Sequence, residues 1–172
     1  MAKFKANYYY KNIYDINYLK LKKAGIKYLI FDLDNTLGLI TEKSCPKETV
    51  KLINKLKKDF TVLIISNNTK KRLTPYLNEL GIDGVWWSMK PLTRGLRKLL
   101  KKYNLQKEEM AIIGDQLVTD ILAGNSFGIC TILVDPLGKK DLKITSLNRF
   151  IEERIIKYYR KRDIFERGKY YE

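Results

Sequence analysis

Polar side chains follow several apolar runs of this chain, and their types suit chemistry on a phosphate group. The apolar run that begins at Tyr28 ends in Asp32 and Asp34, two positions apart. A second acidic pair follows the apolar run at 110–114. Carboxylates, a hydroxyl and an ammonium group can together hold a divalent cation, bind a phosphate and balance its charge. The candidate site residues are Asp32, Asp34, Ser66, Asn67, Lys90, Asp115 and Asp120.

The segments around these residues predict a parallel α/β sheet that would bring them together. Short apolar runs, typical of buried strands, alternate with stretches of helical periodicity. The apolar runs lie at 28–33, 61–66, 84–87, 110–114 and 130–134, and the helical stretches at 17–24, 46–58, 70–80, 92–103 and 118–125. We therefore expect an α/β fold: a single Rossmann-like domain whose parallel sheet has about five strands flanked by helices. Ligands of such sheets bind beyond the carboxyl ends of the strands, where the candidate residues fall.

Converging carboxylates repel one another and raise one another's pKa unless a cation lies among them. The chain contains no histidine, which excludes histidine phosphotransfer, Ser-His-Asp hydrolysis and histidine-ligated metals. Oxygen ligands favour a hard cation, so Mg²⁺ is the expected cofactor. The nucleophile would then be a carboxylate that forms an aspartyl-phosphate. The residues alone leave open whether Asp32 or Asp34 attacks, although acid/base work suits the residue farther into the loop, which has more freedom.

Four features of the chain resemble motifs I to IV of the haloacid dehalogenase-like (HAD) phosphatases. They are, in order, DLDNT at 32–36, Ser66, Lys90 and GDQLVTD at 114–120. The resemblance implies that Asp32 is the nucleophile. It further implies that Asp34 protonates the leaving oxygen and later activates water, while its backbone carbonyl contacts Mg²⁺.

The same resemblance assigns the remaining candidates. Ser66 and backbone N–H groups near Asn67 would hold the phosphate, and Lys90 would balance its charge. Asp115 would ligate the metal together with Asp32 and Asp34. Asp120 would not bind the metal directly but would hold Lys90 or the water molecules on the metal.

Neither gap between the motifs has room for a cap domain, because each holds about one helix and one strand. An uncovered site suits phosphates on large molecules or at a membrane surface.

The chain also resembles a narrower group, the YqeG-type class III A phosphatases, which are similar to phosphatidylglycerophosphate phosphatases. The residues that carry this resemblance are the lead-in to the first strand, DLDNTL, Lys90-Pro91-Leu92 and GDQLVTD. The resemblance implies dephosphorylation of phosphatidylglycerophosphate to phosphatidylglycerol. A nucleotide, sugar or nucleic-acid-end phosphate remains an alternative substrate. The residues 86–89, TrpTrpSerMet, depart from the small residues expected before Lys90.

Positive charge is concentrated at the two ends of the chain. The formal net charge is +15; residues 1–30 carry seven Lys against one Asp, and residues 139–172 carry eleven Lys or Arg against six Asp or Glu. Ten of the twelve Tyr also lie in these ends. Basic, aromatic segments suit an anionic membrane surface or a nucleic acid, or are simply solvated. A basic RNA- or ribosome-associated protein with a vestigial HAD core is therefore a second alternative.

The chain is expected to divide into a capless phosphatase domain at 1–138 and a basic, Tyr-rich helix and tail at 139–172. Ser146 could cap that last helix, and the residues after Arg162 show no period and are expected to be loose. No apolar stretch reaches the roughly 20 residues of a membrane span. We therefore expect a cytoplasmic protein, and its basic ends allow peripheral association with the inner face of the membrane.

Overall fold

The computed structural model describes residues 2–138 and 143–172, with the side chains of residues 2 and 143–147 left out of the description. Its centre is one sheet of six parallel strands in the order β1-β6-β5-β2-β3-β4. The strands are β1 Tyr8–Tyr10, β2 Tyr28–Phe31, β3 Thr61–Ile65, β4 Asp83–Val85, β5 Met110–Gly114 and β6 Cys130–Val134. The parallel α/β fold is confirmed, and β1 adds an edge strand to the five that the sequence predicted.

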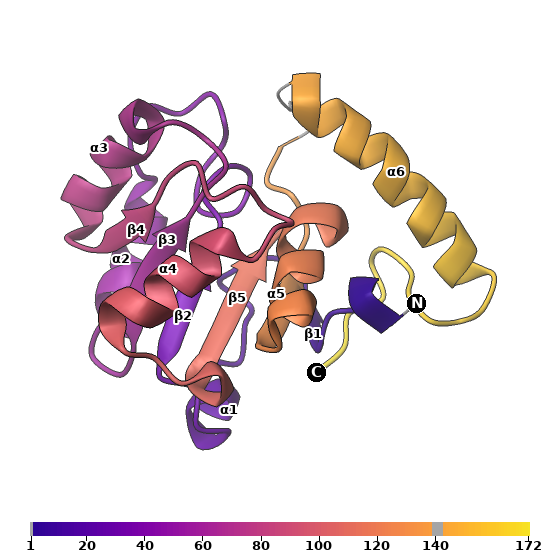
Figure 1. Ribbon diagram of the computed structural model, residues 1–172, viewed down its shortest axis with the longest axis horizontal. Helices are drawn as coiled ribbons and strands as arrows, with labels where there is room; N and C mark the ends of the chain where they lie inside the picture. Colours follow the sequence, from indigo (N-terminus) through magenta and orange to yellow (C-terminus); the bar gives the residue numbers. More distant parts are fainter. Residues whose placement is uncertain (1, 139–142) are drawn as a thin grey trace.

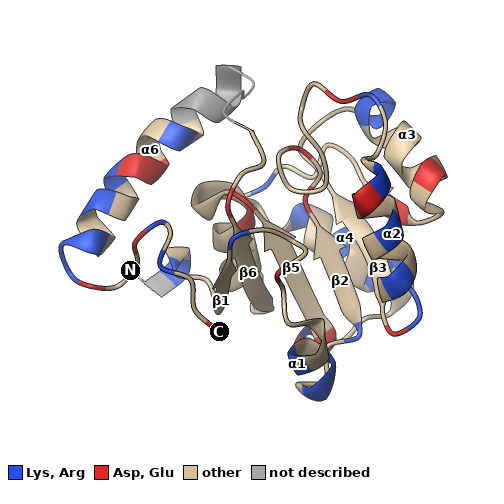
Figure 2. Ribbon diagram, turned by 180° about the vertical axis from the view of Figure 1, so that it is seen from behind, with Lys and Arg blue, Asp and Glu red and all other residues tan. Residues whose placement is uncertain are grey.

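Helices cover both faces of the sheet. Figure 1 shows α4 and α5 in front of the sheet, and Figure 2 shows α2 and α3 on the opposite face, with α1 below the sheet at the end where β2 begins. No separate cap domain covers the carboxyl ends of the strands in the described part of the chain. The helices are α1 Tyr18–Lys23, α2 Lys47–Leu56, α3 Lys70–Leu80, α4 Arg94–Tyr103, α5 Leu122–Phe127 and α6 Lys143–Arg160.

Strand β2 is buried on both faces, and this explains its continuous apolar sequence. Leu29 and Phe31 belong to the core cluster beneath α1, α2 and α3, whereas Ile30 belongs to the cluster beneath α4 and α5. All three side chains are fully buried. Because β2 pairs with β3 on one side and β5 on the other, the residues after β2 emerge at the middle of the sheet edge.

The predicted helices occur with shifts at their ends. The stretch at 118–125 is a π-helical turn, Leu117–Ile121, that continues directly into α5. Pro46 precedes α2 instead of starting it, and α4 begins at Arg94 instead of Leu92. The proposed cap at Ser146 is wrong, since α6 already begins at Lys143. The hydrophobic period alone does not locate helix ends to within one or two residues.

The C-terminal segment packs against the first strand, contrary to the expectation of a loose tail. In both views α6 lies beyond the β1 edge, and the two termini lie near each other there. Phe165 is buried against the ring of Tyr9, with centroids 5.1 Å apart. Tyr171 pairs with Tyr9 through two backbone hydrogen bonds of 2.8 and 3.0 Å. The division expected between residues 138 and 139 borders residues outside the description and stays a prediction.

The described helices include none that combines the length and the hydrophobicity needed to cross a bilayer.

Candidate active site

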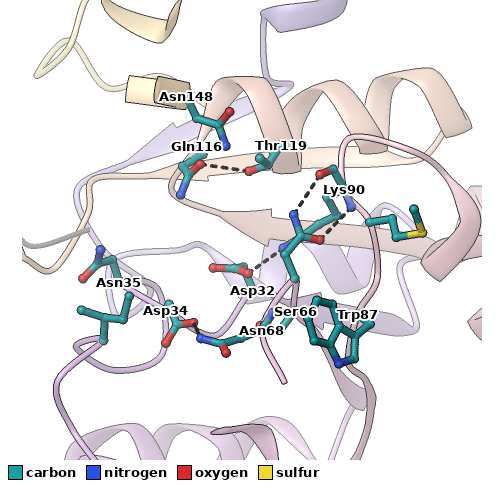
Figure 3. A pocket seen from close by; sticks show the side chains of 13 residues that line it. Asp32, Asp34, Asn35, Ser66, Asn68, Trp87, Lys90, Gln116, Thr119 and Asn148 are labelled. Carbon is teal, nitrogen blue, oxygen red and sulfur yellow. Dashed lines mark hydrogen bonds and ion pairs between the residues drawn. The ribbon is translucent and has the colours of Figure 1, made fainter. Parts of the chain in front are cut away.

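A pocket opens at the carboxyl ends of the central strands, and most of the predicted site residues line it. Asp32 follows β2, Ser66 follows β3, and Lys90 lies on the loop after β4. Figure 3 shows these side chains facing one space, with Asn148 of α6 at its opposite wall. Predicted residues that line the pocket are Asp32, Asp34, Ser66, Asn67 and Lys90. The sheet topology thus brings together groups that are far apart in the sequence.

The ammonium group of Lys90 joins two carboxylates at the base of the pocket. Its Nζ donates hydrogen bonds to Asp32 Oδ1 and to Asp120 Oδ1, both at 2.6 Å, and to the Ile65 carbonyl at 3.1 Å. The side chains of Lys90 and Asp120 are almost completely buried, and that of Asp32 is 11% exposed. All three donor protons of the ammonium therefore have partners, which a buried charge requires.

Burial and mutual charge set the protonation of this group. Burial raises the pKa of Asp32 well above its usual value; the ammonium of Lys90 opposes that rise, while the charge of Asp120 adds to it. Burial alone would lower the pKa of Lys90, but the carboxylates of Asp120 and Asp32 outweigh it and raise that pKa. Lys90 is therefore a fixed positive charge beside Asp32.

Asp32, Asp115 and Asp120 form a buried acidic cluster, with one oxygen of each within 4.8 Å of the others. Asp115 is completely buried, and its Oδ1 makes no hydrogen bond within the described residues. Its Oδ2 accepts a hydrogen bond from Arg149 of α6. Burial raises the pKa of Asp115 to about 7, although the charge of Arg149 opposes the rise. A buried carboxylate oxygen without a donor, among hard oxygen ligands, fits a divalent cation such as Mg²⁺.

Asp34 lies closer to the pocket mouth and is held by two donors. Arg72 Nε donates to its Oδ1 at 2.9 Å, and the Asn68 side-chain amide donates to its Oδ2 at 3.1 Å. Arg72 also donates to the carbonyls of Leu39 and Glu42, so it ties Asp34 to the loop that follows. The structure therefore separates the two aspartates: Asp32 pairs with a lysine at the base, and Asp34 with an arginine at the rim.

Asn67 organises the loop that carries Lys90. Its Oδ1 accepts hydrogen bonds from the Ser88 hydroxyl and the Lys90 N–H, both at 2.7 Å, and its Nδ2 donates to the Lys90 carbonyl at 2.8 Å. The side chain of Asn67 thus holds the loop of Ser88 and Lys90 in place. The Ser66 hydroxyl accepts from the Asn68 N–H at 3.1 Å and lies at the pocket wall.

Three polar residues near the site were not predicted as site residues. Asn68 and Arg72 hold Asp34, and Arg149 holds Asp115. Asn68 directly follows Ser66-Asn67, so its place next to motif II was a usable signal. Arg72 looked like one more basic residue beside Lys70 and Lys71, and Arg149 lies in a distant helix. The local sequence around each arginine looks the same as that around a solvated surface arginine.

The two cysteines do not contribute a nucleophile. Both are free thiols, and Cys45 is buried. Burial raises the pKa of Cys45 to about 12, with the charges of Glu79 and Glu42 acting in the same direction. A thiol of this kind is protonated at neutral pH and unreactive.

Comparisons with known proteins agree with the site. A sequence profile described as haloacid dehalogenase-like hydrolase matches residues 39–128. The chain is 39% identical over 150 residues to the probable phosphatase YqeG of Bacillus subtilis, a match that covers 85% of this chain and 86% of the relative. It is 27% identical over 143 residues to phosphatidylglycerophosphate phosphatase 1, chloroplastic/mitochondrial, of Arabidopsis thaliana, covering 76% of this chain and 40% of that protein.

A solved structure shares the fold. The cobalt-bound deoxy-D-mannose-octulosonate 8-phosphate phosphatase of Haemophilus influenzae superposes with a TM-score of 0.51 at 20% identity, over 84% of this chain and 95% of the other. With the matched profile and the similarity to YqeG, these findings show that the chain belongs to the haloacid dehalogenase-like hydrolases, as a HAD-type phosphatase.

Proposed function

We propose that this protein is a Mg²⁺-dependent phosphomonoester hydrolase that works through an aspartyl-phosphate on Asp32. The observation that carries the proposal is the buried bridge of Lys90 between Asp32 and Asp120, at the base of an open pocket. A carboxylate paired with one fixed ammonium is oriented for attack, and the same ammonium can neutralise an entering phosphate.

The first step joins Asp32 to the phosphoryl group. A carboxylate oxygen of Asp32 attacks phosphorus as the bond from phosphorus to the ester oxygen breaks. Asp34 donates its proton to the leaving oxygen, so the alcohol departs neutral. The Ser66 hydroxyl and the N–H groups after β3 bind the phosphoryl oxygens, and Lys90 balances their charge.

The second step frees the enzyme. Asp34, now ionised, takes a proton from a water molecule, whose oxygen attacks phosphorus and breaks the bond to Asp32. Inorganic phosphate leaves, Asp32 is again a carboxylate and Asp34 again carries its proton. Mg²⁺, held by the carboxylates of Asp32 and Asp115 and the Asp34 carbonyl, would supply charge neutralisation for the phosphoryl oxygens. Asp120 then serves to hold Lys90.

For the substrate we propose phosphatidylglycerophosphate, dephosphorylated to phosphatidylglycerol. Two observations support it: the similarity to the phosphatidylglycerophosphate phosphatase of Arabidopsis thaliana, and the open pocket without a cap domain. An open pocket can receive a headgroup phosphate while the acyl chains remain in the membrane.

The test is a phosphatase assay with Mg²⁺ on phosphatidylglycerophosphate in mixed micelles, beside nucleotide, sugar and oligonucleotide-end phosphates. We expect the highest kcat/KM for the lipid, loss of turnover on chelation of the metal, and a fall in turnover of at least about 10³-fold in Asp32→Asn. Good hydrolysis of soluble monoesters with none of the lipid would refute the substrate and retain the mechanism. Absence of hydrolysis of every phosphate would refute the mechanism itself.

A further inference from the structure

The loop that carries Lys90 presents large apolar side chains to solvent at the mouth of the pocket. Trp87 is 64% exposed, Met89 48% and Leu92 59%. Trp87 and Met89 also line the pocket, and Figure 3 shows the Trp87 ring to the right of Ser66 and Asn68. Single exposed apolar residues are ordinary, but three within six positions beside a catalytic pocket form a patch that indicates an interaction surface. We name Trp87, Met89 and Leu92 the rim patch.

The backbone holds the rim patch outward. Trp87 and Met89 have φ of 49° and 60°, the left-handed region that side chains other than glycine rarely adopt. The intervening Ser88 is buried, and its hydroxyl is bonded to Asn67. The Trp87 N–H is bonded to the Asn68 carbonyl at 3.1 Å. The alternation of an inward serine with outward Trp87 and Met89 is thus fixed by the same contacts that place Lys90.

One basic side chain contacts the rim patch, and two others contact the residue that precedes it. Lys70 and Lys98 lie over the ring of the neighbouring Trp86, at 5.1 and 5.5 Å from its centroid. An Arg94 guanidinium nitrogen lies 4.0 Å from the Met89 sulfur. Apolar side chains that include a tryptophan, flanked by cations, are complementary to an anionic lipid surface, where the chains enter the interface and the cations meet the headgroups.

Part of the aromatic content of the chain ends is used inside the fold. Tyr9, Tyr10 and Tyr159 are buried inside the fold. Tyr9 packs against Phe165 and Tyr171 of the tail. Three of the ten tyrosines of the chain ends are therefore unavailable for a membrane contact, while Tyr14 and Tyr170 remain 44% and 45% exposed.

We propose that the rim patch docks the protein on an anionic lipid bilayer, with Trp87, Met89 and Leu92 entering the interface and the pocket mouth facing the headgroups. This inference rests on the proposed function, because docking would bring Lys90 and Asp32 to a substrate phosphate that stays in the membrane plane. It is tested separately, since docking requires no hydrolysis.

The test measures sedimentation with vesicles of phosphatidylcholine alone, or of equal parts phosphatidylcholine and phosphatidylglycerol. We expect binding only to the anionic vesicles, weakened by salt. Leu92→Ser should lower that binding about tenfold, since one leucine side chain leaves the interface. The matched control is Leu19→Ser, which removes a leucine of similar exposure, 62%, from α1 at the opposite end of the strands; it should bind like the unchanged protein.

Tryptophan fluorescence locates the contact. Vesicles whose acyl chains carry bromine should quench the emission of the unchanged protein, and Trp87→Phe should lose most of that quenching because Trp86 is only partly exposed. Asp32→Asn should bind and be quenched like the unchanged protein, so that a failure of catalysis leaves docking measurable.

Three results would overturn the proposal. Equal loss of binding in Leu92→Ser and Leu19→Ser would show a nonspecific effect. Loss of binding in Phe150→Ser on α6, with Leu92→Ser unaffected, would move the contact to the C-terminal helix. Tighter binding to a single-stranded oligonucleotide than to anionic vesicles would assign the basic rim to nucleic acid.

Discussion

Asp32 and Asp34 differ in their surroundings far more than their spacing in the sequence suggests. Asp32 is buried against a lysine ammonium, whereas Asp34 contacts the guanidinium of Arg72 near the pocket mouth. A nucleophile benefits from a fixed position, while an acid and base must reach both the leaving oxygen and water. The fixed position of Asp32 beside the ammonium favours it as the proposed nucleophile, and leaves Asp34, the other aspartate that lines the pocket, as the proposed acid and base.

The two roles predict different behaviour for two similar substitutions. Asp32→Asn removes the attacking carboxylate, so hydrolysis should fall at least about 10³-fold and no phosphoryl group should become attached. Asp34→Asn keeps the nucleophile but loses the base for the second step. It should therefore accumulate protein that carries one phosphoryl group when given an activated aryl phosphate.

Intact-protein mass spectrometry after rapid acid quenching distinguishes these outcomes. Each asparagine variant serves as the other's control, since both keep the shape of the side chain. A phosphorylated Asp32→Asn protein, or one in which the phosphoryl group lies on Asp34, would reverse the assignment.

Some residue-level features could be predicted and others could not. Four candidate residues each follow one of the successive apolar runs, and this order was enough to predict that they lie at one edge of the sheet. They are Asp32, Ser66, Lys90 and Asp115. The partners of their side chains were not predictable in the same way. Arg72 and Arg149 reach the site only because their helices pack beside it. A single sequence carries no signal for that packing.

At the scale of elements, the junction of β5 with the π-helical turn Leu117–Ile121 positions the acidic cluster. Gly114 ends β5, and a Cβ on it would overlap the carboxylate carbon of Asp120. The Asp120 carboxylate also accepts from the Gln116 N–H at 3.2 Å, which closes the turn over the glycine. The glycine is therefore required for the close approach that lets Asp120 reach Lys90.

Gly114→Ala is expected to push Asp120 away from Lys90. Overpacking of this kind costs about 1 to 3 kcal/mol of the free energy of unfolding. Weaker Mg²⁺ binding should accompany the loss, because Asp32 and Asp115 would also shift. Urea denaturation measures the first effect and calorimetric titration with Mg²⁺ the second. If both quantities are unchanged, the turn is adaptable and Gly114 has no part in forming the site.

Elements with a clear hydrophobic pattern were predicted well, and the edge strand β1 was not. Helix α3 begins and ends where its sequence predicts, between Thr69, which accepts from the Arg72 N–H, and Gly81 with φ of 59°. Strand β1 was missed because three tyrosines show no period. Its pairing depends on β6 and on the tail residue Tyr171, both far away in the sequence.

At the scale of the whole molecule, the C-terminal segment is tied to the site by a buried carboxylate. Glu152 of α6 accepts hydrogen bonds from the Leu117 N–H at 2.8 Å, from Arg149 at 3.0 Å and from Arg167 at 2.9 Å. Leu117 starts the turn that carries Asp120, and Arg149 holds Asp115. The sequence predicts a basic helix here, and only its packing reveals that it contacts the acidic cluster.

Glu152→Ala should therefore loosen the tail and weaken the whole fold. It leaves Arg149 and Arg167 without a shared buried partner and removes the acceptor of the Leu117 N–H. Breaking a buried ion pair from one side costs about 3 kcal/mol of the free energy of unfolding. Urea denaturation measures that loss, and limited proteolysis should now cleave within residues 148–167, which the intact protein protects through packing. Glu153→Ala is the matched control, because Glu153 is the exposed neighbour on the same helix; equal effects of the two substitutions would mean that α6 does not brace the site through Glu152.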